Sequence, residues 1–143
     1  IAKAKKLAAS FEASAVSFTQ HDVFSLSVEG GSKSAPNIII ISGLFELYEN
    51  NTQVHRVISH LFALMQEGGY LVYTGQPWHP QIEMIGRLLN NRQGDRWIMR
   101  RRVQAEMDQL VTSVGFSKLN TASDELGIFT VSCARKPFAN TNK

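Results

Sequence analysis

The sequence contains little cysteine and no long apolar run, and each shortage excludes certain classes of protein or site. Its one cysteine, Cys133, excludes an internal disulfide and a zinc site built from several cysteines, and it fits a reducing, cytoplasmic compartment. The longest run of aliphatic residues is Ile38–Ile41, whereas a membrane-crossing helix needs about 20 apolar residues. The 143 residues, 43% of them hydrophobic and 19% charged, therefore predict one globular domain.

The four histidines give no metal-binding pattern. His55 and His60 are five positions apart, which places them off a shared helical face, and His21 and His79 lie far from them in the sequence. We therefore expect no metal site.

Positive charge is concentrated in residues 87–102, which we call the arginine segment. It holds one acid, Asp95, and six arginines: Arg87, Arg92, Arg96, Arg100, Arg101 and Arg102. Such a cluster can bind an anionic substrate, a lipid head group or nucleic acid, but a solvated surface is the more ordinary interpretation. Trp97 is its one aromatic residue, and because single-strand binders usually offer several stacking rings, the segment disfavours nucleic acid.

Hydrophobic periodicity predicts helices and strands that alternate through the middle of the chain. Apolar residues three and four apart predict helices at residues 3–14, 52–65, 81–89 and 103–114. Short apolar or alternating runs predict strands at residues 15–21, 37–42, 70–74, 118–121 and 128–134. This order favours an α/β sheet, mostly parallel, that closes with an antiparallel hairpin.

The isoleucine run Ile38–Ile41 shows no alternation of apolar and polar residues. A short β-branched run of this kind is typical of a strand buried on both faces, as in a parallel sheet. We therefore expect it to be an inner strand.

Several stretches resemble the later part of class I S-adenosylmethionine-dependent methyltransferases. They are Gln20–Phe24, similar to an acidic motif that contacts adenine; Ile38–Phe45, similar to the fourth strand and its loop; Glu67–Tyr73, similar to the entry to the fifth strand, with Glu67 in place of the usual proline; and Val114–Phe116, similar to the entry to the closing hairpin. Two more, Tyr73–Gln81 and Trp97–Arg102, resemble a bacterial group of that family whose members often follow an α/β-hydrolase domain.

The resemblance implies a partial methyltransferase domain over residues 1–136 and a tail over residues 137–143. The implied sheet is Rossmann-like, with the strand order third, second, first, fourth, fifth, seventh, sixth. The family's glycine-rich cofactor loop and its first two strands have no counterpart here. Because a sheet with two empty positions would lose hydrogen bonds and burial, we expect the chain to be part of a longer polypeptide or to be completed by a second chain.

The resemblance also implies a site at the carboxyl ends of the strands, where open α/β sheets bind ligands. The residues implied to hold S-adenosylmethionine are Asp22, Val23, Ser42, Gly43, Leu44 and Phe45. The residues implied to contact the methyl acceptor are Tyr48, Gln76, Trp78 and Arg100. His79 or Glu46 would take a proton from the acceptor. Ordinary turns and solvated loops are the alternative interpretation of all these positions.

The implied activity is methyl transfer from S-adenosylmethionine to an unidentified acceptor, which can be a small molecule or lipid-like. The alternative is a catalytically inactive, methyltransferase-like module that serves binding or assembly through the arginine segment. A nicotinamide-dependent oxidoreductase would need a Gly-x-Gly-x-x-Gly loop, which is equally absent.

Overall fold

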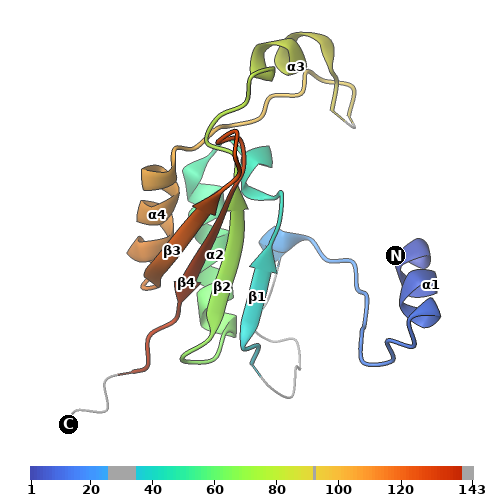
Figure 1. Ribbon diagram of the computed structural model, residues 1–143, viewed down its shortest axis with the longest axis vertical. Coiled ribbons are helices and arrows are strands. Elements are labelled where there is room, and N and C mark those ends of the chain that lie inside the picture. Colours follow the sequence, from blue (N-terminus) through green and yellow to red (C-terminus); the bar gives the residue numbers. More distant parts are fainter. Residues whose placement is uncertain (26–34, 92, 140–143) are drawn as a thin grey trace.

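A computed structural model describes residues 1–25, 35–91 and 93–139, and within them a sheet of four strands forms the centre (Figure 1). The strands are β1 Ile38–Ile41, β2 Tyr70–Gly75, β3 Ser117–Ser123 and β4 Thr130–Arg135. The α-helices are α1 Ala2–Ser10, α2 Asn51–Leu64, α3 Ile82–Leu88 and α4 Gln104–Ser113. Two short 3₁₀ helices are η1 Val23–Ser25 and η2 Phe45–Leu47.

The strand order confirms the predicted fold class. Across the sheet the order is β1-β2-β4-β3, which is the order that the resemblance gives for its fourth, fifth, seventh and sixth strands. β1 pairs in parallel with β2, and β4 runs antiparallel to both β2 and β3. The described residues therefore form a mixed, open sheet that ends in the predicted C-terminal hairpin.

The hydrophobic core lies between one face of the sheet and the helices α2 and α4. The periodicity of α2 predicts its buried side chains correctly: Val54, Val57, Ile58, Leu61 and, just after the helix, Met65. Facing them are buried side chains from the sheet and from α4: Leu71, Tyr73, Ala134, Met107 and Val111. Asn50 caps α2, since its side chain accepts a hydrogen bond of 2.7 Å from the Thr52 N–H.

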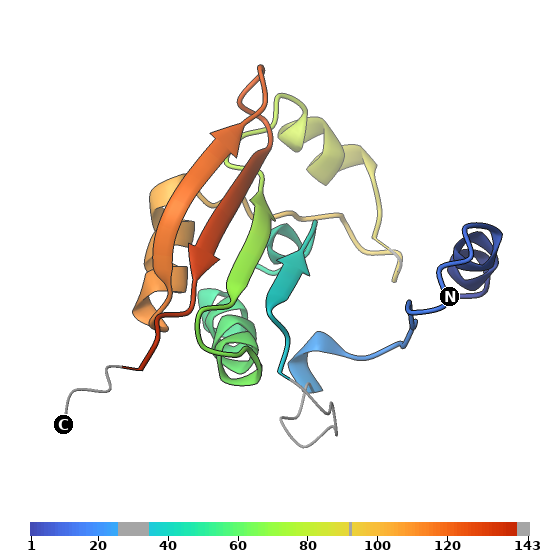
Figure 2. The same cartoon turned by 60° about the horizontal axis from the view of Figure 1, so that its bottom comes forward.

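The expectation that Ile38–Ile41 is an inner strand is wrong for the described residues. β1 lies at the border of the sheet (Figure 2). Ile39 and Ile41 pack against the core, whereas Ile38 and Ile40 are 60% and 68% exposed. No described segment pairs with the outer side of β1. One face of this strand is therefore covered by the core, and the other face is exposed.

The predicted strand at residues 15–21 is also wrong, because these residues form no regular element and pair with no described strand. Alternating side chains favour an extended backbone, but a strand forms only when a neighbour takes up its N–H and C=O groups. In Figure 1 the segment runs from α1 to η1 at a distance from the sheet. Of the predicted tail, residues 137–139 are non-regular and residues 140–143 lie outside the described residues.

Two of the predicted helices form but bury little. α1 has no buried side chain, and Leu7 and Phe11 on its predicted apolar stripe are 60% and 75% exposed. α3 likewise has no buried side chain, and Leu88 is 74% exposed. Figure 1 shows both helices apart from the sheet, with α3 beyond the carboxyl end of β2.

Candidate functional site

The candidate site lies at the carboxyl ends of β1 and β2. Because the two strands are parallel neighbours, the loops that follow them begin at the same edge of the sheet. The Gly43 N–H donates a hydrogen bond of 2.8 Å to the Thr74 side-chain oxygen, which ties the loop after β1 to β2. Gly43 has a φ of +63°, a conformation that glycine adopts without strain, and no atom lies within 4 Å of where a Cβ would stand.

The loop after β1 turns from solvent into the core. Ser42 and Gly43 are exposed, Leu44 is half-buried, and Phe45 at the start of η2 is buried. Tyr48 follows η2 and stacks edge-to-face against Phe24, with ring centroids 4.7 Å apart. This contact brings η1 beside the loop, so the two stretches with predicted cofactor contacts are neighbours in the structure.

Asp22 and Val23 lie at the beginning of η1. The Asp22 carboxylate accepts a hydrogen bond of 3.0 Å from the Phe24 N–H, the usual role of an aspartate that starts a turn. Val23 is half-buried at the margin of the core. The Asp22 side chain remains exposed and can accept further hydrogen bonds.

Glu46 carries the most unusual side chain at this edge, since the residue is only 6% exposed. Its Oε2 atom is buried and has no hydrogen-bond partner in the described part of the chain. Burial raises the pKa of its carboxyl above the ordinary value, and the positive charges of Arg101 and Arg102 offset only part of that effect. A buried carboxyl with a raised pKa is the kind of group that can act as a general base.

Glu46 lines a small hollow of about 10 Å³, roughly the room that one water molecule needs. Its other walls are Phe45, Thr74, Gly75, Gln76, Arg100, Arg102 and Met107. Gln76, which the sequence predicts as an acceptor contact, here accepts a hydrogen bond from the Arg101 guanidinium. The loop after β2 and the arginine segment therefore meet at Glu46.

Trp78 and His79 lie further along the loop after β2. Trp78 is 54% exposed, and the His79 Nδ1 atom accepts a hydrogen bond of 3.1 Å from the Gln81 N–H. Within residues 35–91 and 93–139, no hydrogen bond joins either side chain to Glu46. The structure thus brings Glu46 and Gln76 together and leaves Trp78 and His79 at the outer part of the loop.

The last three arginines of the arginine segment point into the protein. Arg102 is 4% exposed, and Arg100 forms an ion pair of 2.5 Å with Glu106. Arg87 pairs with Glu83 on the surface of α3, and Arg92 lies outside the described residues. Arg100, Arg101 and Arg102 therefore use their guanidinium groups in contacts within the chain, while Arg96 is exposed.

Sequence reasoning missed the partners that hold these arginines, above all Asn51 and Glu106. Neither residue belongs to a motif that the sequence or the resemblance assigns to the site. The one local signal is that both residues lie in the first turn of a helix, α2 or α4. That signal is weak, since polar residues are frequent in first turns for reasons of helix stability alone. In residues 1–25, 35–91 and 93–139, no three side chains of the metal-binding kinds gather in one place.

Replacing Glu46 with glutamine is expected to change how stability depends on pH. The folded chain holds the Glu46 proton to higher pH than the unfolded chain does, so this carboxyl contributes stability below its ordinary pKa of 4.5 and loses that contribution as pH rises through the raised value. Glutamine keeps the shape of the side chain but does not titrate. Measured by urea unfolding from pH 4 to pH 8, the free energy of unfolding of E46Q should therefore rise relative to that of the unsubstituted chain as pH rises. If the two free energies change in parallel with pH, the raised pKa of Glu46 is contradicted.

Comparisons with known proteins agree with this geometry. Residues 1–136 match a protein family described as "Putative methyltransferase". Over 120 residues, 83% of this chain, the sequence is 47% identical to the uncharacterized protein YnbC of Escherichia coli K12, and the match covers 20% of that protein. The chain thus spans about a fifth of the length of this curated relative.

Two solved structures share the fold. An O-methyltransferase family protein from Burkholderia thailandensis has a TM-score of 0.68 at 15% identity, over 95% of this chain and 40% of that one. Magnesium protoporphyrin IX methyltransferase from Synechocystis PCC 6803, with bound SAH, has a TM-score of 0.60 at 18% identity, over 83% of this chain and 50% of that one. None of the helices in the described part of the chain has the length and apolar character to cross a membrane.

Proposed function

The chain belongs to the methyltransferase family that matches residues 1–136, and from this membership we propose that it forms the later part of an S-adenosylmethionine-dependent methyltransferase. The proposal includes an unidentified acceptor, small or lipid-like, a cytoplasmic location, and a preceding segment or second chain that supplies the glycine-rich loop. The observation that carries it is the edge formed by β1 and β2, where η1, the loop after β1 and the loop after β2 converge.

The residues at this edge fit part of the cofactor. The open room above Gly43 allows a ligand to approach the backbone of the Ser42–Phe45 loop, which suits the methionine end. The exposed Asp22 carboxylate, with Val23 beside it, suits an adenine amino group. When bound, S-adenosylmethionine supplies an electrophilic methyl group, and the residues that would hold its ribose are outside this chain.

The chain's own contribution to the reaction is to orient the acceptor and to manage its proton. Glu46 is our first candidate base, because its carboxyl is buried, has a raised pKa and has one oxygen without a hydrogen-bond partner among the described residues. His79 is the second candidate, and the accessible Trp78 beside it offers an apolar contact. Tyr48, Gln76 and Arg100 line the same edge and are proposed acceptor contacts, with Gln76 held in place by Arg101.

Calorimetric titration with S-adenosylhomocysteine tests the proposal. We expect binding by the full-length gene product and much weaker binding by residues 1–143 alone, because the chain carries no glycine-rich loop. Asp22→Asn should weaken the affinity of the full-length product about fivefold or more, the loss expected for one hydrogen bond to a charged acceptor. Asp124→Asn is the matched control, since Asp124 also accepts backbone hydrogen bonds in a turn, in the β3–β4 connection.

A full-length product that binds no S-adenosylhomocysteine would overturn the proposal. It would favour the inactive module, which the described arginines support poorly, because Arg87, Arg100 and Arg102 already have partners within the chain. Equal losses from Asp22→Asn and Asp124→Asn would contradict the role of Asp22 while leaving the binding itself intact.

A further inference from the structure

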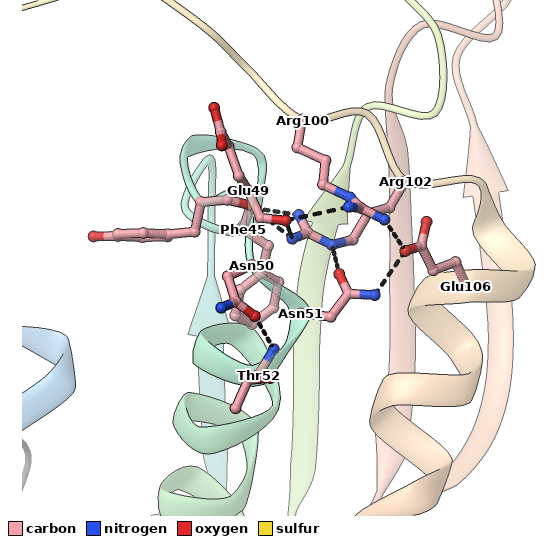
Figure 3. A network of polar contacts seen from close by, with 9 residues as sticks. Phe45, Glu49, Asn50, Asn51, Thr52, Arg100, Arg102 and Glu106 are labelled. Atoms are coloured by element: carbon pink, nitrogen blue, oxygen red, sulfur yellow. Dashed lines mark hydrogen bonds and ion pairs between the residues drawn. The ribbon is translucent and has the colours of Figure 1, made fainter.

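The Arg102 side chain makes four hydrogen bonds to residues 45–51, which follow β1, and Arg100 Nη1 adds a bond of 3.3 Å to the Glu49 carbonyl oxygen (Figure 3). Its Nη1 donates a hydrogen bond of 2.7 Å to the Phe45 carbonyl oxygen, and its Nη2 donates bonds of 2.7 Å and 3.3 Å to the carbonyl oxygens of Tyr48 and Glu49. Its Nε donates a bond of 2.7 Å to the Asn51 side-chain oxygen. One buried guanidinium therefore joins both ends of the stretch 45–51.

A second layer of contacts fixes the partners of Arg102. The Asn51 side-chain nitrogen donates a bond of 2.7 Å to Glu106 Oε1, the oxygen that also pairs with Arg100. The hydrogen bond from Asn51, together with that from Arg100 and against the effect of burial, holds the pKa of the Glu106 carboxyl below its usual range. Glu106 therefore stays ionised near neutral pH and keeps Asn51 turned toward Arg102, as Figure 3 shows.

The loop itself offers weaker support. Its short helix η2 has hydrogen bonds of 3.1 Å from the Leu47 N–H and 3.4 Å from the Tyr48 N–H, in the tight geometry that makes 3₁₀ bonds poor. The Arg100 N–H adds a bond of 3.0 Å to the Glu46 carbonyl oxygen. Charged donors give the stronger hydrogen bonds, so the arginines do more to fix this backbone than the loop's own bonds do.

We propose that Arg102 is a positioning residue for ligand binding, which sets the backbone of residues 45–49 and with it the Glu46 carboxyl and the Tyr48 ring. The proposal rests on the proposed function, since it assumes that the ligand is held by this loop. It predicts a requirement for the guanidinium shape as well as its charge, because three carbonyl oxygens and one amide oxygen are reached from a planar fork. A lysine keeps the charge but offers one nitrogen in place of three.

The test compares Arg102→Lys with Arg87→Lys in the full-length gene product. Arg87 belongs to the same arginine segment, but among the described residues its partner is Glu83, in an ion pair on the surface. We expect R102K to weaken binding of S-adenosylhomocysteine about tenfold or more and R87K to change it less than about twofold. Amide hydrogen exchange should speed up in R102K at Leu47 and Tyr48 and stay unchanged at Ile58 in the core.

The two readouts separate the possible failures. If the unsubstituted protein does not bind S-adenosylhomocysteine, the proposed function fails, and exchange at Leu47 and Tyr48 still decides whether Arg102 sets the loop. Unchanged affinity and exchange in R102K would overturn the positioning role, as would faster exchange spread equally over the loop and Ile58. If R102K does not fold, Asn51→Ala gives the same test with smaller expected changes, because it removes one acceptor of Arg102 and leaves the Asn50 cap in place.

Discussion

Replacing Ile58 with alanine is expected to lower the free energy of unfolding by about 2–5 kcal/mol. Ile58 is 0% exposed and lies on the buried face of α2, in the same core cluster as Leu71 and Val111. The truncation removes buried methyl and methylene groups and leaves a cavity that neighbouring helix and sheet can fill only in part. Urea unfolding monitored by circular dichroism gives the change directly.

The loss should matter more here than in a domain with two covered faces. Of the described helices, α2 and α4 pack on one face of the sheet, so one cluster carries most of the apolar stabilisation, and natural domains have only about 5–15 kcal/mol in total. Leu88→Ala is the matched control, because Leu88 is also a helical residue but is 74% exposed. It should change stability by less than about 0.5 kcal/mol, and similar losses from both variants would contradict the core as described.

The elements that the sequence predicts best are those that pack against or pair with other elements of the same chain. α2 is the clearest case, because its five predicted core positions are buried and its capping asparagine is in place. β2 and the β3–β4 hairpin follow in the same way, since their partners are other strands of this chain. Where the partner is present, a periodicity of 3.6 or 2 is sufficient to predict both the element and its buried face.

The errors concern the surroundings of an element more than its type. Ile38–Ile41 does form a strand, and α1 and α3 do form helices, but their apolar side chains stay largely exposed. An apolar pattern tells which side chains gain from burial, but it does not identify what covers them. Residues 15–21 show the limit of this reasoning, because a strand is defined by a partner that the pattern does not contain.

Some features of the candidate site could be predicted from the sequence, and others could not. The loops after β1 and β2 could be predicted, because parallel strands bring their carboxyl ends to one edge. The burial of Glu46 and the contacts of Arg102 could not, because the bond from Arg102 to the Phe45 carbonyl joins residues 57 positions apart. Three consecutive arginines are typical of a solvated surface, and only the folded chain shows the carbonyl oxygens that they bind.

The substitution Ile40→Lys is expected to lower stability to very different extents in two forms of the protein. In residues 1–143 alone, Ile40 is 68% exposed, so the change should cost less than about 1 kcal/mol, mostly through lower strand propensity. In the full-length gene product we expect a loss of about 3 kcal/mol or more, because the isoleucine run predicts a strand covered on both faces once the sheet is complete, where lysine would bury an unpaired ammonium group. Urea unfolding of both forms measures the difference.

Ile40→Val provides the control, because valine keeps the strand propensity and adds no charge. It should leave the free energy of unfolding of the short form nearly unchanged and lower it by about 1 kcal/mol where the side chain is buried. A large loss from lysine in the full-length product alone would show that the isoleucine run becomes an inner strand once its neighbours are present. A small loss in both forms would mean that β1 remains a border strand in the whole protein. The glycine-rich cofactor loop could then not enter beside β1, and the proposed methyl transfer would lose the architecture on which it depends.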